Sequence, residues 1–218
     1  MANILSAGGV IGNEGSRGAN PGGAPPWQPP RSRADRQAEE AALACVRDGR
    51  RNDGLNILGR VYGGPLDSFA LRVVRDPELA KDVRQQVLLD AFQGIERFEG
   101  RSTLWSWLCG IAYHRCLDEL RRGRRASEMD DFAVSDELAG LPHLVMDDDR
   151  VDKRRALERC LGKLPDALRA QLLMRCFLGL SYAEIAAVVG ISPGTVQVRI
   201  SRILPQLRRC LRGEGVAR

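Results

Sequence analysis

The sequence predicts an all-α protein with two small helical domains joined by a flexible acidic linker. Three observations support this prediction. Aromatic residues make up only 5% of the 218 residues, which is too few for the aromatic-rich core of a typical β-sandwich. Apolar residues recur at spacings of three and four along two long stretches, the pattern of amphipathic helices. A run of acidic residues lies between these stretches.

The first 33 residues differ in composition from the rest of the chain. They hold seven glycines and five prolines but few large apolar side chains, so burial cannot offset the entropy lost on ordering them. We expect residues 1–33 to form a disordered extension. No apolar run approaches the roughly 18 residues of a membrane span, and the start lacks the pattern of a signal peptide. We therefore expect a cytoplasmic protein without membrane insertion.

Residues 34–125 are predicted to form the first helical domain. It contains one helix with an inward apolar stripe, after which Gly100 interrupts the pattern. The next helix is expected to begin near Ser102 or Thr103 and to end in a cluster of arginines, because cations suit a helix C-terminus. The stripe of the first helix consists of Val83, Val87, Leu88, Ala91, Phe92, Ile95 and Phe98, and that of the second of Leu104, Leu108, Ile111, Ala112 and Leu120.

Charge is strongly segregated beyond this domain. Positions 126 to 149 hold eight acidic residues and no Lys or Arg, whereas positions 150 to 218 hold 14 Lys or Arg against five Asp or Glu. A basic module suits a polyanion, and an acidic stretch suits a linker that repels one. Residues 126–150 are therefore predicted to be the linker, in agreement with their Asp, Ser, Gly and Pro content.

Residues 151–218 are predicted to form the second, basic domain. Its first helix is expected to run to about Leu161, and Pro165 suits the first position of the next helix. The last helix is expected to run to about Leu211, with a kink or a missing hydrogen bond at Pro205.

A helix-turn-helix pattern lies within this second domain. Ser181 and Glu184 have the spacing of a capping box at the start of a short helix. Gly190 permits a left-handed turn, and Ser192 and Pro193 suit the beginning of the following helix. The two helices would meet through Ile185, Ala186, Val189, Ile191, Val196, Ile200 and Ile203. This arrangement is typical of DNA-binding domains.

The outward face of the last helix carries side chains that suit DNA recognition. Gln pairs with adenine, Arg with guanine or phosphate, and Val contacts a thymine methyl group. The alternative is a helical hairpin with a solvated polar face. The outward residues are Thr195, Gln197, Val198, Arg199, Ser201 and Arg202.

Both domains resemble parts of the bacterial RNA polymerase sigma factors of the extracytoplasmic-function group, in the sigma-70 family. The stretches 179–186 and 194–202 look like region 4 of these factors. The stretches 82–86 and 107–122 are similar to region 2. The resemblance covers about residues 50–212, and the two regions follow one another in the family's order.

The resemblance implies a promoter-specificity subunit of RNA polymerase, which is not an enzyme. Region 2 would bind core polymerase and open the −10 element, region 4 would read the −35 element in the major groove, and the linker would thread the RNA path. An anti-sigma protein is a further candidate partner. The implied polymerase contacts are Asp82, Gln85, Gln86 and Leu89. The implied −10 contacts are Ser102, Thr103, Trp105, His114, Asp118, Arg121 and Arg122, and the implied −35 contacts are Gly194, Thr195, Gln197, Val198, Arg199, Ser201 and Arg202.

Some of these positions depart from the family's pattern. Trp105 stands where a polar or basic residue is usual and is expected to be exposed, whereas Trp107 is expected to pack in the core. His114 replaces a common Asn and Val198 a usual Ser, which bears on the promoter sequence more than on the activity. For His114, a neutral hydrogen-bonding role is favoured over a pH-sensitive one.

The sequence indicates no metal or other cofactor. The six cysteines are far apart, so we expect reduced, buried thiols rather than a disulfide framework. Cys109 and Cys116 would lie about 10 Å apart along a helix, too far for one zinc ion. A redox switch through Cys45 or Cys210 remains open.

Two other functions remain open from the sequence. One is a conventional helix-turn-helix regulator, which binds duplex operator DNA as a dimer and does not need core polymerase. The other is a protein-interaction adaptor whose basic face is incidental, which would show no salt-dependent DNA binding. The sequence offers no Gly-rich phosphate loop and no nucleophile elbow, so an enzyme is not expected.

Overall fold

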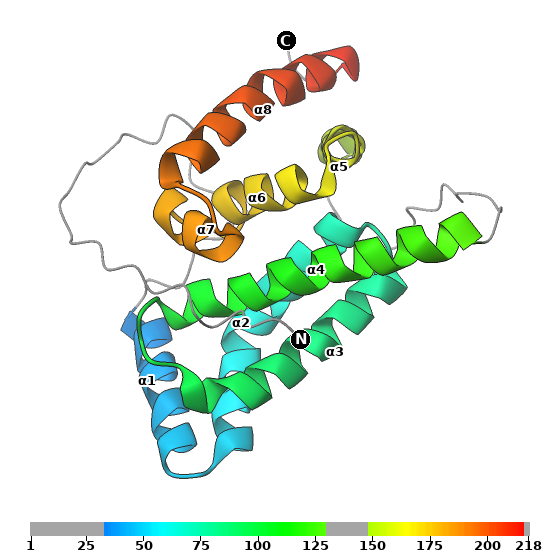
Figure 1. The fold of residues 1–218 in the computed structure, drawn as a ribbon. Coiled ribbons are helices and arrows are strands. Elements are labelled where there is room, and N and C mark those ends of the chain that lie inside the picture. The colour runs from blue at the N-terminus through cyan, green and yellow to red at the C-terminus, as the bar shows by residue number, and fades with distance from the viewer. Residues whose placement is uncertain (1–32, 130–147, 216–218) are drawn as a thin grey trace.

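The computed structural model describes residues 33–129 and 148–215, and helices are its only regular elements there. Figure 1 shows two layers, with α1 to α4 below and α5 to α8 above; the long α4 lies on the side of the lower layer that faces the upper one. The prediction of an all-α fold is confirmed. The elements are α1 (Arg33–Arg47), α2 (Arg51–Val74), α3 (Pro77–Gly94), the short 3-10 helix η1 (Ile95–Arg97), α4 (Leu104–Met129), α5 (Asp148–Gly162), α6 (Asp166–Cys176), α7 (Tyr182–Val189) and α8 (Pro193–Gly213).

Two of the predicted segments fall largely outside this description. The predicted extension 1–33 and most of the predicted linker 126–150 lie outside the described residues. At both ends of the linker the helices are longer than expected, since α4 continues to Met129 and α5 begins at Asp148. Acidic residues suit the first turn of a helix, because they complement its dipole.

The lower layer depends on a close contact between its first two helices. A Cβ atom on Gly54 of α2 would lie 2.7 Å from the carbonyl oxygen of Ala42 in α1, so only glycine fits this crossing. At the other end of α2, Arg75 adopts a left-handed conformation with φ of 62°. That conformation costs a residue with a Cβ atom about 1–2 kcal/mol.

Polar side chains cap the N-termini of α3 and α4, and an ion pair links the two helices. The Asp76 carboxylate accepts two backbone N–H groups at the start of α3, at 2.7 and 3.0 Å. Thr103 caps α4, since its Oγ1 accepts the N–H of Ser106 at 3.0 Å. Between the helices, Arg115 of α4 donates from Nε and Nη2 to Asp90 of α3, at 2.5 and 2.6 Å.

The helix-turn-helix forms as predicted. Ser181 and Glu184 make a complete capping box at the start of α7. Gly190 ends α7 in the left-handed conformation, with φ of 73°, and the Ser192 side chain accepts the N–H of Thr195 at 3.2 Å to begin α8. Pro193 occupies the first turn of α8, and Pro205 lies inside that helix. Pro165 differs slightly from the prediction, because it precedes α6 as its N-cap.

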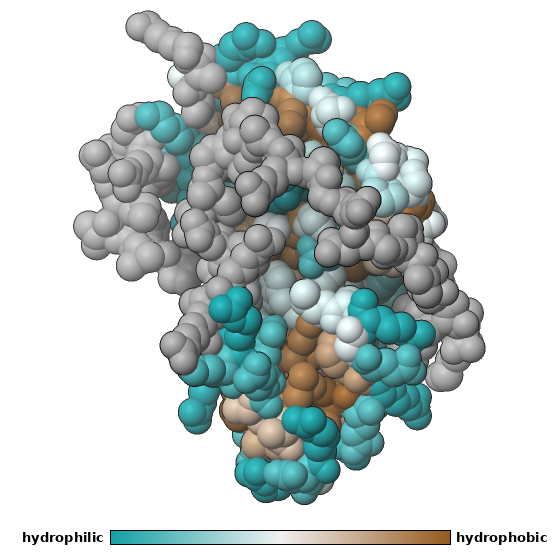
Figure 2. Space-filling model, turned by 90° about the vertical axis from the view of Figure 1, so that its left-hand side faces the viewer, coloured by the Kyte–Doolittle hydropathy of each residue, from teal (hydrophilic) through white to brown (hydrophobic). Residues whose placement is uncertain are grey.

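One hydrophobic core connects the two layers. Phe69 of α2, Ala112 of α4, Met174 of α6 and Ile200 of α8 all belong to one cluster of buried side chains. The two halves that the sequence separates by a linker are therefore packed together in this structure. Figure 2 shows the side on which α1 lies, where the described surface is largely hydrophilic around an apolar strip. None of the described helices is long and apolar enough to cross a bilayer.

Candidate nucleic-acid and polymerase interfaces

The outer face of α8 is a polar, basic surface. Val196, Ile200 and Ile203 point into the core and are at most 4% exposed. The opposite face carries every predicted −35 residue in an exposed position, namely Gly194, Thr195, Gln197, Val198, Arg199, Ser201 and Arg202. The structure therefore confirms the prediction that these side chains face outward on this helix.

The charge on α8 favours contact with a polyanion. The helix contains five arginines and no acidic residue. Among the described residues, neither Arg199 nor Arg202 makes an ion pair with the protein itself. Their guanidinium groups are therefore available for phosphate or guanine, the partners that a forked donor suits best.

The exposed face of α3 forms a second candidate surface. Asp82 and Gln85 are exposed, and Gln86 is half-buried. Leu89 is 52% exposed and its neighbour Leu88 48% exposed. Large apolar side chains on a solvent-facing helix are typical of a partner-binding surface when polar residues surround them.

The prediction that Leu88 points inward is wrong. Val87 and Ala91 occupy the inward face of α3, and one residue further along a helix turns the side chain by about 100°. Leu88 is thereby carried to the solvent side, next to Leu89.

The predicted −10 residues on and before α4 do not form one exposed surface. Arg121 and Arg122 are exposed at its C-terminal half, where they pair with Asp118 and Glu119. Asp118 itself is half-buried. Ser102 and Thr103 are exposed just before α4 begins. Between these ends, α6 and α7 pack against α4 (Figure 1).

The prediction that Trp105 is exposed is wrong. Its side chain is only 5% exposed and its ring lies 4.9 Å from that of Tyr62. The indole N–H donates to the carbonyl of Leu178, in the segment between α6 and α7, at 3.2 Å. A buried indole needs such a hydrogen-bond partner, and the second half of the chain provides it. Trp107 packs as predicted, with its ring 5.6 Å from Phe98.

His114 also contacts the upper layer. Its Nε2 lies 3.1 Å from the carbonyl oxygen of Val188 in α7. Burial lowers the pKa of His114, although the hydrogen bond to Val188 and the charge of Asp118 act in the opposite direction. The neutral imidazole is therefore favoured, and Nε2 donates to the carbonyl. This agrees with the hydrogen-bonding role expected for His114, but its partner is protein.

A buried arginine joins the two layers at the end of α2. Arg169 of α6 is 3% exposed, and its guanidinium donates to the carbonyl of Val73, with Nε at 3.1 Å. Asp166 pairs with Arg169 at 2.7 Å and also with Arg124 of α4. Burial lowers the pKa of Arg169, while Asp166 favours its charged form. Sequence reasoning missed this contact, because its partners lie 96 residues apart.

The prediction that all cysteines are reduced thiols fails for one pair. Cys160 and Cys210 are joined by a disulfide, so the expectation of six reduced thiols is wrong for these two. Cys45, Cys109 and Cys116 are free and buried as expected, whereas Cys176 is free and exposed. The spacing of cysteines in the sequence did not reveal that α5 and the end of α8 lie side by side.

A helix-turn-helix whose second helix has an exposed, basic outer face is typical of a DNA-binding transcription factor. Comparisons with known proteins identify the family within this class. Residues 60–126 match the family model described as Sigma-70 region 2, and residues 154–207 match that of Sigma-70, region 4.

Relatives and solved structures agree with these models. The chain is 31% identical over 158 residues to the RNA polymerase sigma-H factor of Pseudomonas aeruginosa, covering 69% of this chain and 82% of the relative. It is 32% identical over 157 residues to the ECF RNA polymerase sigma factor SigM of Mycobacterium tuberculosis, covering 71% and 75%. Its fold resembles that of the sigma factor RpoE from Bartonella quintana, solved with the anti-sigma factor NepR, at a TM-score of 0.60 and 22% identity over 83% of this chain and 98% of that one.

The chain belongs to the sigma-70 family and, within it, to the extracytoplasmic-function group. It is a promoter-recognising sigma factor for transcription initiation, and not an enzyme. This excludes the conventional regulator and the adaptor as accounts of its overall function.

Proposed function

We propose that this sigma factor divides promoter recognition between its two halves. In this proposal α8 reads the −35 element in duplex DNA, α4 and the two residues before it capture the −10 element, and the outer face of α3 binds core RNA polymerase. The carrying observation is the exposed, acid-free outer face of α8 opposite its three buried branched residues.

The geometry of α8 supports its role as the duplex reader. Its N-terminus is exposed at Gly194 and Thr195, and helix N-termini attract phosphate groups. Gln197 and Arg199 follow within about one turn and are also exposed. In helix-turn-helix proteins the N-terminal part of the second helix contacts base edges in the major groove.

The exposed face of α3 supports a contact with core polymerase. Leu88 and Leu89 supply apolar area, and Asp82 and Gln85 supply polar groups at its edge. Interfaces are usually built from an apolar centre with a polar rim. Leu88 was absent from the predicted polymerase contacts, and we add it to them.

The −10 site is proposed on the part of α4 that the upper layer covers in this structure. Ser102, Thr103, Arg121 and Arg122 lie at its exposed ends, and Trp105 and His114 lie beneath the α6–α7 segment. Single-stranded bases bind by stacking on aromatic rings and by contacts to arginine. Capture of the −10 strand by Trp105 or His114 therefore requires α6 and α7 to move away from α4.

We also propose an anti-sigma partner and a cytoplasmic location. The resembling structures RpoE and CnrH were solved with the anti-sigma factor NepR and with the cytosolic domain of CnrY. CnrH is 25% identical to this chain at a TM-score of 0.59, covering 81% of this chain and 98% of that one. A partner of this kind would compete with core polymerase for the α3 face. A sigma factor also has to meet its polymerase in the cytoplasm.

Co-elution with bacterial core RNA polymerase tests the proposal. The full chain should co-elute with core, and substitution of Asp82, Gln85 and Gln86 by alanine should abolish co-elution. A matched control replaces Asn52, Asn56 and Arg60, three exposed residues on one side of α2, and should still co-elute. Equal binding by both variants would exclude the α3 face as the polymerase contact.

A further inference from the structure

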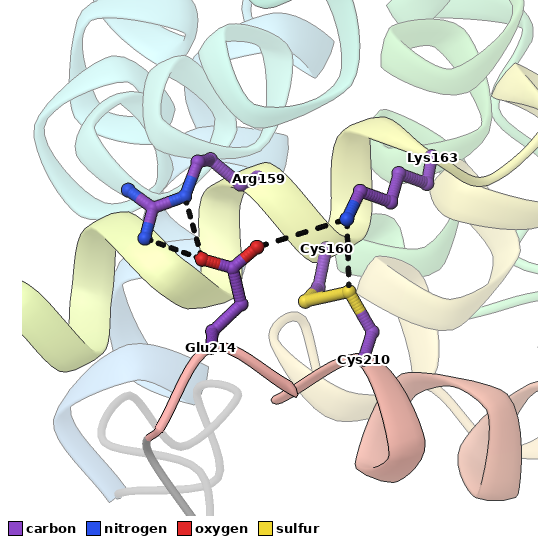
Figure 3. The surroundings of a disulfide bond; sticks show 5 residues. All are labelled: Arg159, Cys160, Lys163, Cys210 and Glu214. Carbon is purple, nitrogen blue, oxygen red and sulfur yellow. Dashed lines mark hydrogen bonds and ion pairs between the residues drawn. A yellow bond between two sulfur atoms is a disulfide. The ribbon is translucent and has the colours of Figure 1, made fainter. Parts of the chain in front are cut away.

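The disulfide fixes the end of the proposed DNA-reading helix to the upper layer. Cys160 lies near the end of α5 and Cys210 near the end of α8, 50 residues apart in sequence and 5.8 Å apart between Cα atoms (Figure 3). The first half of α8 is held by Val196, Ile200 and Ile203 in the core. Beyond Pro205 the helix offers only half-buried side chains such as Leu207. Among the described residues, the disulfide is therefore the covalent attachment of this second half, and the ion pairs of Glu214 with Arg159 and Lys163 add to it.

The two sulfur atoms have different surroundings. Cys160 is 2% exposed, whereas Cys210 is half-buried. The ammonium group of Lys163 lies 3.5 Å from Sγ of Cys210 (Figure 3). A cation at this distance stabilises the negative charge of a thiolate, which is the reactive form of cysteine. When the disulfide is open, Cys210 is thus the accessible and activated member of the pair.

Glu214 holds Lys163 and the helix end in place. Its carboxylate accepts hydrogen bonds from Arg159 at 2.9 and 2.6 Å and lies 3.7 Å from Nζ of Lys163. The hydrogen bond from Arg159 lowers the pKa of Glu214 further below neutral pH, which favours the ionised carboxylate. Lys163 therefore sits between a carboxylate and the Cys210 sulfur.

A divalent metal is the competing occupant of this cluster. Ligand atoms of Cys160, Cys210 and Glu214 lie within 4.8 Å of one another. However, Arg159 and Lys163 already pair with the carboxylate, and Lys163 also places a positive charge 3.5 Å from the Cys210 sulfur. These cations oppose a metal ion and favour anionic sulfur, so the surroundings suit thiol chemistry better.

We propose that Cys160 and Cys210 form a reversible, peroxide-sensitive dithiol–disulfide site, in which Cys210 is oxidised first and Cys160 resolves it. The Cys210 thiolate attacks one oxygen of hydrogen peroxide, the O–O bond breaks, and hydroxide leaves and takes up a proton to form water. The product is a sulfenic acid on Cys210. The Cys160 thiol then attacks this sulfur, the S–S bond forms, and the S–O bond breaks with release of a second water.

A dithiol reductant reverses the reaction. Its thiolate attacks Cys210, the more accessible sulfur, and Cys160 leaves as a thiolate that takes up a proton. The reductant's second thiol then releases Cys210, and the reductant becomes a disulfide. In the cytoplasm that we propose for this protein, disulfides are usually transient or redox-sensing. The chemistry itself depends on neither polymerase nor promoter, so its test is independent of the proposed function.

Oxidation should stabilise the folded protein and, within it, the second half of α8. Cross-linking two positions 50 residues apart restricts the unfolded chain substantially. Reduction should therefore lower the midpoint of thermal unfolding by roughly 5 °C or more. The second half of α8 should become less protected against hydrogen exchange, while the half before Pro205 changes less.

Intact-mass and peptide-mass analysis of the full chain tests the site. Reduced protein treated with hydrogen peroxide should lose two hydrogens and yield a peptide pair linked through Cys160 and Cys210. In the Cys160→Ser variant, dimedone should label Cys210 as a sulfenic acid. Lys163→Met should slow this labelling roughly threefold or more, whereas Lys153→Met, at the other end of α5, should not.

Three results would overturn the proposal. The first is oxidation of Cys176 in preference to Cys210, since Cys176 is the exposed free thiol in the described part of the chain. The second is equal labelling rates in the two lysine variants. The third is stoichiometric zinc binding by the reduced protein that is lost in Cys160→Ser, which would make the cluster a metal site. The wild-type oxidation product decides the pairing even if a variant folds poorly.

Discussion

The two proposed DNA-binding surfaces are in opposite states in this structure. The outer face of α8 is exposed along its length, and its arginines 199 and 202 have no ionic partner in the described regions. The middle of α4 is covered, because Trp105 and His114 hydrogen-bond carbonyl groups of the upper layer. Under the proposed function, the structure is therefore a closed state, in which α8 can contact duplex DNA and α4 cannot capture a single strand.

The largest effect is expected on the exposed surface. Substitution of Arg199 and Arg202 together by alanine should strongly reduce transcription from a promoter selected by the wild-type holoenzyme. Each arginine that contacts a base or phosphate contributes about 1–3 kcal/mol, or roughly 5- to 150-fold. Core polymerase binding should be unchanged, because α8 lies on the upper layer, away from α3. In vitro transcription and co-elution measure the two effects separately.

A charge-matched control is available on the same helix. Arg208 is exposed, and nine residues from Arg199 place it on the opposite side of α8, since each residue turns by about 100°. Arg208→Ala should reduce transcription far less than Arg199→Ala, which removes the same charge. If both had the same effect, net charge rather than a defined reading face would account for DNA binding.

The covered surface can be opened by a steric wedge. A Cβ atom on Gly110 of α4 would lie 3.3 Å from Val188 of α7, so a larger side chain has no room in the closed state. Gly110→Leu also favours helix formation in α4. Overpacking costs about 1–3 kcal/mol, which should shift the balance from closed to open by roughly 5- to 150-fold.

Acrylamide quenching of Trp105 fluorescence measures this opening. Trp27 and Trp107 are first replaced by Phe, so that Trp105 alone reports. Quenching should rise several-fold in Gly110→Leu and stay unchanged in Gly123→Leu, because a Cβ at Gly123 meets nothing within 4 Å. Unchanged quenching in the wedge variant would contradict a separable contact between α4 and α7.

Local features of both surfaces were predictable from the sequence, and contacts between the layers were not. The orientation of Gln197 and Arg199 follows from helical periodicity, and the cap at Ser181 and turn at Gly190 depend on a few adjacent residues. Trp105 was assigned wrongly because comparison with the family's usual residue outweighed periodicity. Its spacing of three and four from Leu108 and Cys109 places it on the inward stripe, which is the signal that was missed.

The remaining differences come from long-range packing. The carbonyl that accepts the indole N–H of Trp105 is 73 residues away, and the disulfide partners are 50 residues apart. Neither composition nor spacing specifies that α5 and the end of α8 lie side by side. The placement of Lys163 beside Cys210 has the same origin, since the sequence offered only the adjacent arginines as cations near this thiol.

A smaller effect is expected from pH, acting on the closed contact through His114. Burial in the closed state lowers the pKa of His114 below its ordinary value near 6.5. Opening exposes the ring and restores the ordinary pKa, so the open state takes up a proton more readily. The closed contact is therefore at full strength above pH 6.5 and weakens as pH falls towards the lower pKa of the buried ring. Trp105 quenching should rise a few-fold over that interval.

The His114→Gln variant isolates this contribution. Glutamine still donates a hydrogen bond to the Val188 carbonyl but does not titrate, so its Trp105 quenching should vary little with pH. Asp118, Arg115 and Arg121 are the charged groups that act on His114, and they remain in the variant. An equal pH response in both proteins would assign the effect to another group.

The smallest effect distinguishes the two helix caps of the helix-turn-helix. Ser181→Ala and Ser192→Ala each remove one cap, and each should lower the free energy of unfolding by about 1 kcal/mol, as measured by urea denaturation. Their other effects should differ. The Ser181 cap includes Glu184, whose carboxylate also accepts a hydrogen bond from Thr103 at 3.4 Å, so its loss should increase Trp105 quenching. The Ser192 cap begins α8, so its loss should weaken duplex binding and leave quenching unchanged. Reversed effects would mean that α7, and not α8, faces the duplex.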